Sequence, residues 1–119
     1  MRMSSKKLNP SLKNQITKTF AQTIADLKDF NELHAFFKDF LNESEYETFA
    51  KRLAIAYWLM KGRSYKNIKD NLKVSSATIA DVAFAMKRKG FLLALKKLEA
   101  EEWATKWAQK IRSFTKVLG

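Results

Sequence analysis

Apolar residues recur at intervals of three and four through most of this 119-residue chain, and few residues interrupt the pattern. The sequence holds three glycines and one proline, and its β-branched residues are scattered instead of alternating with polar ones. A period of three to four is that of an amphipathic helix, whereas strands need alternation and hairpins need turn residues. The sequence therefore predicts an all-α fold of about six helices.

Length and composition restrict the organisation of the chain. A chain of 119 residues with 46% hydrophobic residues suffices for one core and is short for two, so we expect a single domain over residues 1–119. The absence of cysteine and the presence of one histidine, His34, argue against disulfides and a zinc site. No run of eighteen apolar residues and no signal peptide are present, so we expect a cytoplasmic protein without metal or membrane.

Positive charge is unevenly distributed. The formal net charge is +11, and residues 1–25 and 87–97 carry several lysines and arginines but no acid. Residues 26–47 carry seven acidic residues against two lysines. Any single lysine is explained by solvation of a helix face, but clustered cations on a small helical domain are typical of a protein that binds nucleic acid. Double-stranded DNA is therefore the expected partner.

Residues 64–90 resemble two short helices joined by a tight turn. Ile68 and Leu72 share one face of the first, and Ile79 and Val82 belong to a buried stripe of the second. We expect Ser75 or Ser76 to cap the second helix and Gly90 to end it. The pattern predicts a helix-turn-helix over residues 65–89, with an ordinary helical hairpin as the alternative.

The second helix of this unit is expected to carry a face suited to the DNA major groove. Small residues at its start let a helix N-terminus approach base edges closely, and its far end is basic. The outward residues are Ser76, Ala77, Ala80, Asp81, Phe84, Lys87 and Arg88.

The other helices are predicted from their capping residues and from the spacing of their apolar residues. Asn9 and Pro10 start a helix that runs to about Lys28, and Asn31 caps a second helix. Asn42 and Glu45 form a capping box that opens a third helix, which ends at Gly62. We assign residues 1–41 to dimerisation helices, 42–62 to a central helix and 91–119 to an amphipathic basic helix. The abundant aromatic residues favour a homodimer. Their helical spacing favours packing in the core or in a subunit interface over stacking on bases for four residues, Trp58, Trp103, Trp107 and Phe114.

About half of the chain resembles the bacterial Trp repressor family. The similar pieces are the helix start at residues 41–45, Arg52 in mid-helix, the glycine stop at residues 59–62 and Ala77-Thr78-Ile79 at the start of the second short helix. The resemblance implies an intertwined homodimer in which lysines hold phosphates and small residues meet base edges. The expected DNA-binding set, from the resemblance and from the face described above, is Lys66, Lys69, Ser75, Ser76, Ala77, Thr78, Ala80, Asp81, Lys87 and Arg88.

The tryptophan pocket that the resemblance implies is degenerate here. Arg52 occupies the place of one of the two arginines that hold the indole, but Asp81 replaces the other and Ala85 replaces a small polar residue. An acid cannot stack on an indole as a guanidinium does, so we expect no cofactor and no response to tryptophan, with Asp81 bridging to Arg52 as one possibility. The turn has Lys73 in place of a glycine, and a left-handed residue there costs about 1 kcal/mol.

These observations predict a homodimeric, sequence-specific transcription regulator, a repressor by resemblance. The alternative is a basic architectural or interaction protein that binds nucleic acid nonspecifically or contacts a protein partner. An enzyme finds little support, because the chain lacks cysteine and a glycine-rich phosphate loop, and His34 is interpreted as a residue at the edge of the core.

Overall fold

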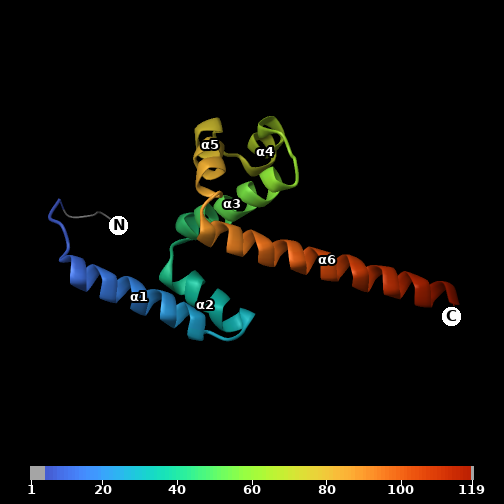
Figure 1. The fold of residues 1–119 in the computed structure, drawn as a ribbon, viewed down its shortest axis with the longest axis horizontal. Helices are drawn as coiled ribbons and strands as arrows, with labels where there is room; N and C mark the ends of the chain where they lie inside the picture. The colour runs from blue at the N-terminus through green and yellow to red at the C-terminus, as the bar shows by residue number, and fades with distance from the viewer. Residues whose placement is uncertain (1–4, 119) are drawn as a thin grey trace. The chain divides into compact units, whose positions relative to one another are not determined.

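The computed structural model describes the backbone of residues 5–118 and the side chains of residues 5–102 and Thr105. This part of the chain holds six α-helices and no strand (Figure 1), so the predicted all-α fold is confirmed. No helix within it is long and apolar enough to cross a membrane. The helices are α1 (Pro10–Asp26), α2 (Phe30–Phe40), α3 (Glu43–Met60), α4 (Tyr65–Leu72), α5 (Ser76–Ala85) and α6 (Lys89–Leu118).

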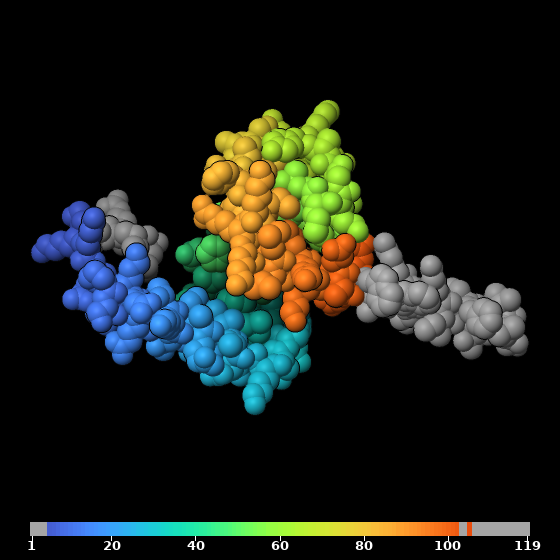
Figure 2. All heavy atoms as spheres, in the orientation of Figure 1, coloured from blue at the N-terminus to red at the C-terminus, as the bar shows by residue number. Residues whose placement is uncertain are grey.

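The chain divides into two compact units, Met1–Tyr46 and Glu47–Gly119, and each is considered by itself. Figure 2 shows the second unit as a close-packed group that runs from green α3 to the orange start of α6. The predicted apolar stripe of α6 from Trp103 onward, with Trp107 and Phe114, lies outside the described side chains.

Side-chain caps start the helices of both units. Asn9 accepts hydrogen bonds from the backbone N–H groups of Ser11 and Leu12, and Pro10 is the first residue of α1, as predicted. Asn42 and Glu45 form the predicted capping box, in which each side chain accepts a hydrogen bond from the backbone N–H of the other.

The predicted cap of the second helix is wrong. Asp29, not Asn31, accepts the hydrogen bond from the Glu32 N–H at 2.8 Å, and α1 ends at Asp26 instead of near Lys28. A carboxylate is a strong cap because it also interacts favourably with the positive end of the helix dipole.

The first unit buries little of its apolar surface. The rings of Phe20 and Phe40 lie 5.6 Å apart, yet α1 and α2 contain no fully buried residue. His34 lies on the surface, which corrects its placement at the edge of the core. Its Nδ1 atom lies 2.8 Å from the Tyr46 hydroxyl, and its ring stacks on Phe30.

The second unit has a well-defined core. Ile55 and Ala56 of α3, Ile68 of α4 and Leu95 of α6 are buried, together with the two residues of α5 predicted from the periodicity, Ile79 and Val82. Trp58 packs against this cluster, as its spacing indicated. The core fixes α4 and α5 onto a base made by α3 and the start of α6.

The end of α3 follows the prediction, whereas the end of α5 does not. Gly62 adopts a φ of 86°, and the N–H of Arg63 reaches back to the carbonyl of Trp58, so glycine ends α3 in a left-handed turn. Helix α5, by contrast, ends at Ala85, and Gly90 lies inside α6 and caps nothing. Met86 turns the chain with an ordinary right-handed φ of −67°, which requires no glycine.

Candidate nucleic-acid interface

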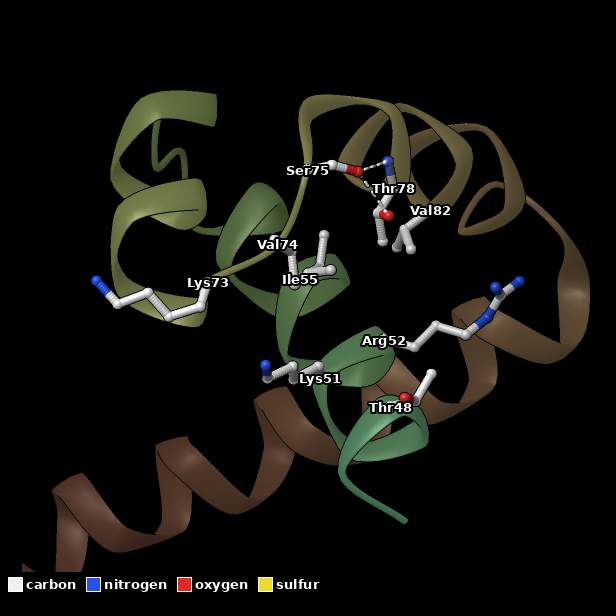
Figure 3. A pocket seen from close by; sticks show the side chains of 9 residues that line it. All are labelled: Thr48, Lys51, Arg52, Ile55, Lys73, Val74, Ser75, Thr78 and Val82. Atoms are coloured by element: carbon white, nitrogen blue, oxygen red, sulfur yellow. Dashed lines mark hydrogen bonds between the residues drawn. The ribbon is translucent and has the colours of Figure 1, made fainter. Parts of the chain in front are cut away.

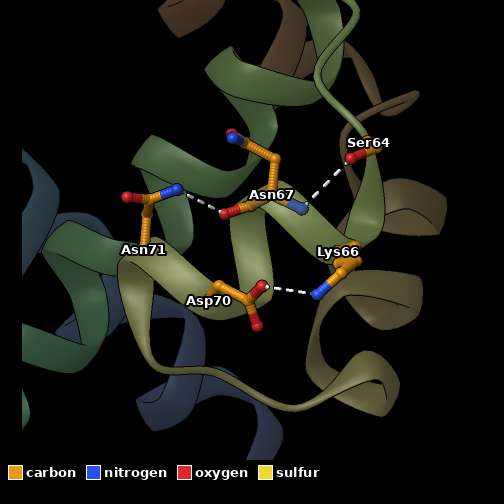
Figure 4. Close-up of polar contacts among 5 residues, drawn as sticks. All are labelled: Ser64, Lys66, Asn67, Asp70 and Asn71. Atoms are coloured by element: carbon orange, nitrogen blue, oxygen red, sulfur yellow. Dashed lines mark hydrogen bonds and ion pairs between the residues drawn. The ribbon is translucent and has the colours of Figure 1, made fainter.

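Helix α4 begins and ends with local hydrogen bonds (Figure 4). The Ser64 hydroxyl caps it by accepting from the Asn67 N–H at 3.1 Å, and the Asn71 amide donates to the carbonyl of Asn67 at 2.8 Å. The cap at Ser64 was not predicted, although a serine just before a helical apolar pattern is itself a usable signal. Helix α4 begins at Tyr65, the first residue of the predicted helix-turn-helix.

Two lysines of α4 were predicted to bind DNA, and both side chains are exposed. Lys66 Nζ lies 3.0 Å from an Asp70 oxygen, in an ion pair one helical turn apart. The hydrogen bond and the charge of Lys66 lower the pKa of the Asp70 carboxyl, and the charges of Lys73 and Lys69 lower it further. Asp70 therefore stays ionised and offsets part of the positive charge of α4.

The turn between α4 and α5 contains the strained residue that the sequence indicated. Lys73 has φ 57° and ψ 52°, and it is the only non-glycine residue with positive φ among those the structure describes. Its N–H donates to the carbonyl of Lys69 at 3.0 Å, which closes α4. Ser75, not Ser76, then caps α5, because its hydroxyl accepts a hydrogen bond from the Thr78 N–H at 3.1 Å.

Helix α5 separates a buried face from an exposed one. The buried face carries Ile79, Val82 and Ala85. Six residues of α5 from the predicted outward or DNA-binding sets are exposed, namely Ser76, Ala77, Thr78, Ala80, Asp81 and Phe84. The core thus turns a row of mainly small side chains toward solvent.

Lys87 and Arg88 are exposed, but they do not continue the face of α5. They lie in the connection between α5 and α6, because α5 ends two residues before Lys87. The guanidinium carbon of Arg88 lies 5.8 Å from the centroid of the Phe84 ring. These two residues and Lys89 make a basic turn beside the end of α5.

A pocket of about 340 Å³ lies between α3 and the turn that leads into α5 (Figure 3). Its floor is apolar, and cationic and hydroxyl side chains surround it. The lining residues are Thr48, Lys51, Arg52, Ile55, Lys73, Val74, Ser75, Thr78 and Val82.

One of the three predicted positions of the degenerate tryptophan pocket lines this pocket. Arg52 lines the pocket, whereas Asp81 and Ala85 are not among its lining residues. Ion pairs in the described part of the chain join Lys51 to Glu47, Lys61 to Glu102 and Lys66 to Asp70, so the bridge considered between Arg52 and Asp81 is not formed.

Sequence analysis missed Thr48 and Lys51 as pocket residues. They lie one turn before Arg52 and Ile55 on α3, and this spacing on a helix face is the signal that relates them. Within the described residues, no three histidine, aspartate or glutamate side chains come close enough to hold a metal ion.

Comparisons with known proteins agree with this architecture. The family model for the Trp repressor protein matches residues 15–104. A crystal structure of a TrpR-like protein from Eubacterium eligens ATCC 27750 is 29% identical and has a TM-score of 0.69, over 76% of this chain and 96% of that one.

A curated relative gives a shorter match. Uncharacterized protein YerC of Bacillus subtilis (strain 168) is 37% identical over 60 residues, which are 50% of this chain and 58% of that protein. The chain thus spans a little over half the length of this relative. The family match covers most of the chain and includes α4, α5 and the core that holds them, so this protein belongs to the Trp repressor family.

Proposed function

We propose that this protein is a sequence-specific, DNA-binding transcription repressor that acts as a homodimer and needs no tryptophan. The Trp repressor family is one of DNA-binding regulators and not of enzymes. One observation carries the proposal: the buried face of α5 is fixed in the core, while its opposite face presents small residues to solvent beside exposed cations. A helix of this kind enters a major groove without steric hindrance.

The cations would position the protein on DNA. Lys69 on α4 and Lys73 in the turn lie before α5, and Lys87 and Arg88 lie after it, so the reading helix is bracketed by groups that bind phosphate. Such contacts hold the helix in register and carry no sequence information by themselves.

The face of α5 would read the bases. Ala77 and Ala80 allow close approach and meet thymine methyl groups, and Ser76 and Thr78 offer hydroxyls to base edges. Asp81 accepts a hydrogen bond from a cytosine amino group. The same carboxylate repels phosphate, which restricts the poses in which α5 enters the groove.

A homodimer would cover apolar surface that one chain leaves exposed. Leu12, Ile16 and Phe20 recur every four residues along α1, and each is 43–49% exposed. Phe49 and Leu53, one turn apart on α3, are also exposed. Two copies would place two α5 helices on half-sites about 34–36 Å apart, one turn of DNA.

Tryptophan is not expected to control this protein. Arg52 lines the pocket near Val82, but no second arginine is among the lining residues, and Asp81, which by the resemblance takes the place of that arginine, carries the opposite charge. Isothermal titration of the protein with L-tryptophan should therefore give no saturable heat, with or without DNA. A saturable isotherm would contradict this part of the proposal.

The rival function is nonspecific DNA binding by an architectural protein, which the clustered cations also favour. Selection from a random duplex library separates the two, because only a specific reader enriches a motif. We expect an enriched sequence with two related half-sites. A library that remains random after selection would favour the rival.

Two variants show whether α5 does the reading. Lys69→Ala should weaken binding to every duplex and keep the enriched motif, since it removes a phosphate contact. Ala80→Leu should change the enriched bases, since it fills space at the groove floor. Equal effects of both variants on all sequences would count against groove reading.

A further inference from the structure

The exposed face of α5 contains one large apolar side chain, Phe84. Its exposed fraction is 69%, and among the described large apolar residues only Phe30, at 75%, is more exposed. Hydrophobic burial disfavours such exposure in an isolated chain, so a ring in this position is suited to a contact made on binding. The other members of the face are small or charged.

Phe84 continues the row that begins at Ala77. Ala77, Ala80 and Phe84 are spaced by three and four residues, so they share one face of the helix. Seven residues separate the first from the last, which is about 10 Å along the helix axis. Base pairs are about 3.4 Å apart, so Phe84 lies about three base pairs beyond Ala77 when α5 lies along the groove.

The charges beside Phe84 favour a nucleic acid over a protein as the occupant. Three consecutive cations, Lys87, Arg88 and Lys89, follow the ring, and all three are exposed. The Arg88 guanidinium lies 5.8 Å from the ring centroid, within the range of a cation–π contact that restrains the ring. An apolar ring restrained beside phosphate-binding groups is suited to the apolar part of a major groove, the thymine methyl group.

We propose that Phe84 contacts a thymine methyl group in each half-site and sets a preference for thymine there. This inference rests on the proposed function and adds a specificity-determining residue to it. The contact requires no hydrogen bond, since burial of the methyl group against the ring supplies the preference.

Thymine-to-deoxyuridine exchange in the selected duplex tests the contact, because it removes only the methyl group. With the wild-type protein, one such exchange in one of the two half-sites should lower affinity about fourfold, the effect of burying one methyl group. The sensitive position should lie about three base pairs from the one whose preference changes in Ala77→Leu. Phe84→Ala removes the contact from both half-sites, so it should bind the thymine duplex about fifteenfold more weakly and show no further loss with deoxyuridine.

Two further variants control for other effects. Phe84→Leu keeps an apolar group and should retain part of the response to deoxyuridine, whereas Leu93→Ala shortens an exposed side chain of α6 and should retain all of it. Because Phe84 is mostly exposed, Phe84→Ala should keep the helical circular dichroism and melting temperature of the wild type.

The outcomes separate this inference from the function on which it rests. If no motif is enriched, the proposed function and the role of Phe84 both fail. If a motif is enriched but Phe84→Ala keeps the full response to deoxyuridine, only the role of Phe84 fails. The same holds if Phe84→Ala weakens binding equally to thymine and deoxyuridine duplexes, because the methyl group would then contribute as much without the ring as with it.

Discussion

Asp70 is the only acidic residue of α4, and its place beside Lys66 gives this single side chain a strong influence on the charge of the proposed interface. Lys66 donates to it, and two further lysines lie near enough to lower its pKa. The pair is exposed, so it adds little to folding stability. Its main effect concerns binding, because a carboxylate held on α4 repels phosphate.

Asp70→Asn should strengthen binding to every duplex and leave the selected motif unchanged. Lys66 becomes available for a phosphate, so the slope of log affinity against log salt should steepen by about 0.9 for each additional phosphate that the variant binds. Salt titration by fluorescence anisotropy measures both effects. Asp39→Asn removes the same charge from α2 and serves as the control. An equal increase in affinity with that variant would show that the effect comes from the net charge of the protein and not from the position of Asp70.

The direction of the Asp70 pKa shift also fixes a pH dependence. A lowered pKa keeps the carboxylate ionised at and above its ordinary range, and protonation occurs only as pH falls below that range. The difference in affinity between wild type and Asp70→Asn should therefore stay constant from about pH 8 to about pH 5. A difference that disappears within this window would contradict the assignment of the repulsion to Asp70.

At the scale of the elements, the turn between α4 and α5 is the strained part of the helix-turn-helix. Lys73 adopts the left-handed conformation that a glycine takes at lower cost, and a neighbouring serine then caps α5. The turn is short, so its geometry sets the angle at which α5 is presented. A cation in this turn adds charge to the proposed interface at the expense of stability.

Lys73→Gly should raise the free energy of unfolding by about 1 kcal/mol, because it relieves the left-handed strain. Lys69→Gly is the matched control, since it places glycine inside α4, where it should lower the free energy of unfolding by about 1 kcal/mol. Urea denaturation followed by circular dichroism measures both. Destabilisation by both variants would show that Lys73 is not strained.

How well each element could be predicted depends on local chemistry. Helix α4 was predicted from the spacing of its apolar residues and the start of α5 from its serine cap, because both are local properties, and Gly62 ended α3 because its φ is positive. The end of α5 was not predicted, because the chain leaves this helix through a residue in the right-handed helical conformation, which needs no special side chain. Gly90 inside α6 is tolerated, so its presence gave a false boundary.

The pocket was beyond prediction for a different reason. Arg52 and Lys51 of α3 meet Lys73 and Thr78 only through the packing of α3 against α5, and these residues are more than 20 positions apart in sequence. Periodicity shows which residues share a face but not which faces meet. Periodicity also cannot distinguish an apolar stripe that packs within one chain from an apolar stripe that packs against a second copy of the chain.

At the scale of the whole molecule, the apolar stripe of α1 supports the prediction of a homodimer. Ile16, at the middle of the stripe, is 49% exposed. Ile16→Glu should weaken self-association strongly, because burying an unpaired carboxylate is costly. Sedimentation equilibrium should show two wild-type chains at micromolar concentration and one chain for this variant.

Asn14→Glu is the control, since Asn14 lies on the opposite side of α1 and should leave the dimer intact. A wild-type protein that sediments as one chain at these concentrations would contradict the homodimer. The proposed spacing of half-sites would then lose its support.

The most direct test of the central claim is the ratio of two dissociation constants at one salt concentration, for the selected duplex and for a shuffled duplex of the same composition. If the exposed face of α5 reads bases, the selected duplex should bind at least about 1,000-fold more tightly. Equal affinities, both falling with salt, would contradict sequence-specific recognition and leave a protein that binds DNA only through its cations.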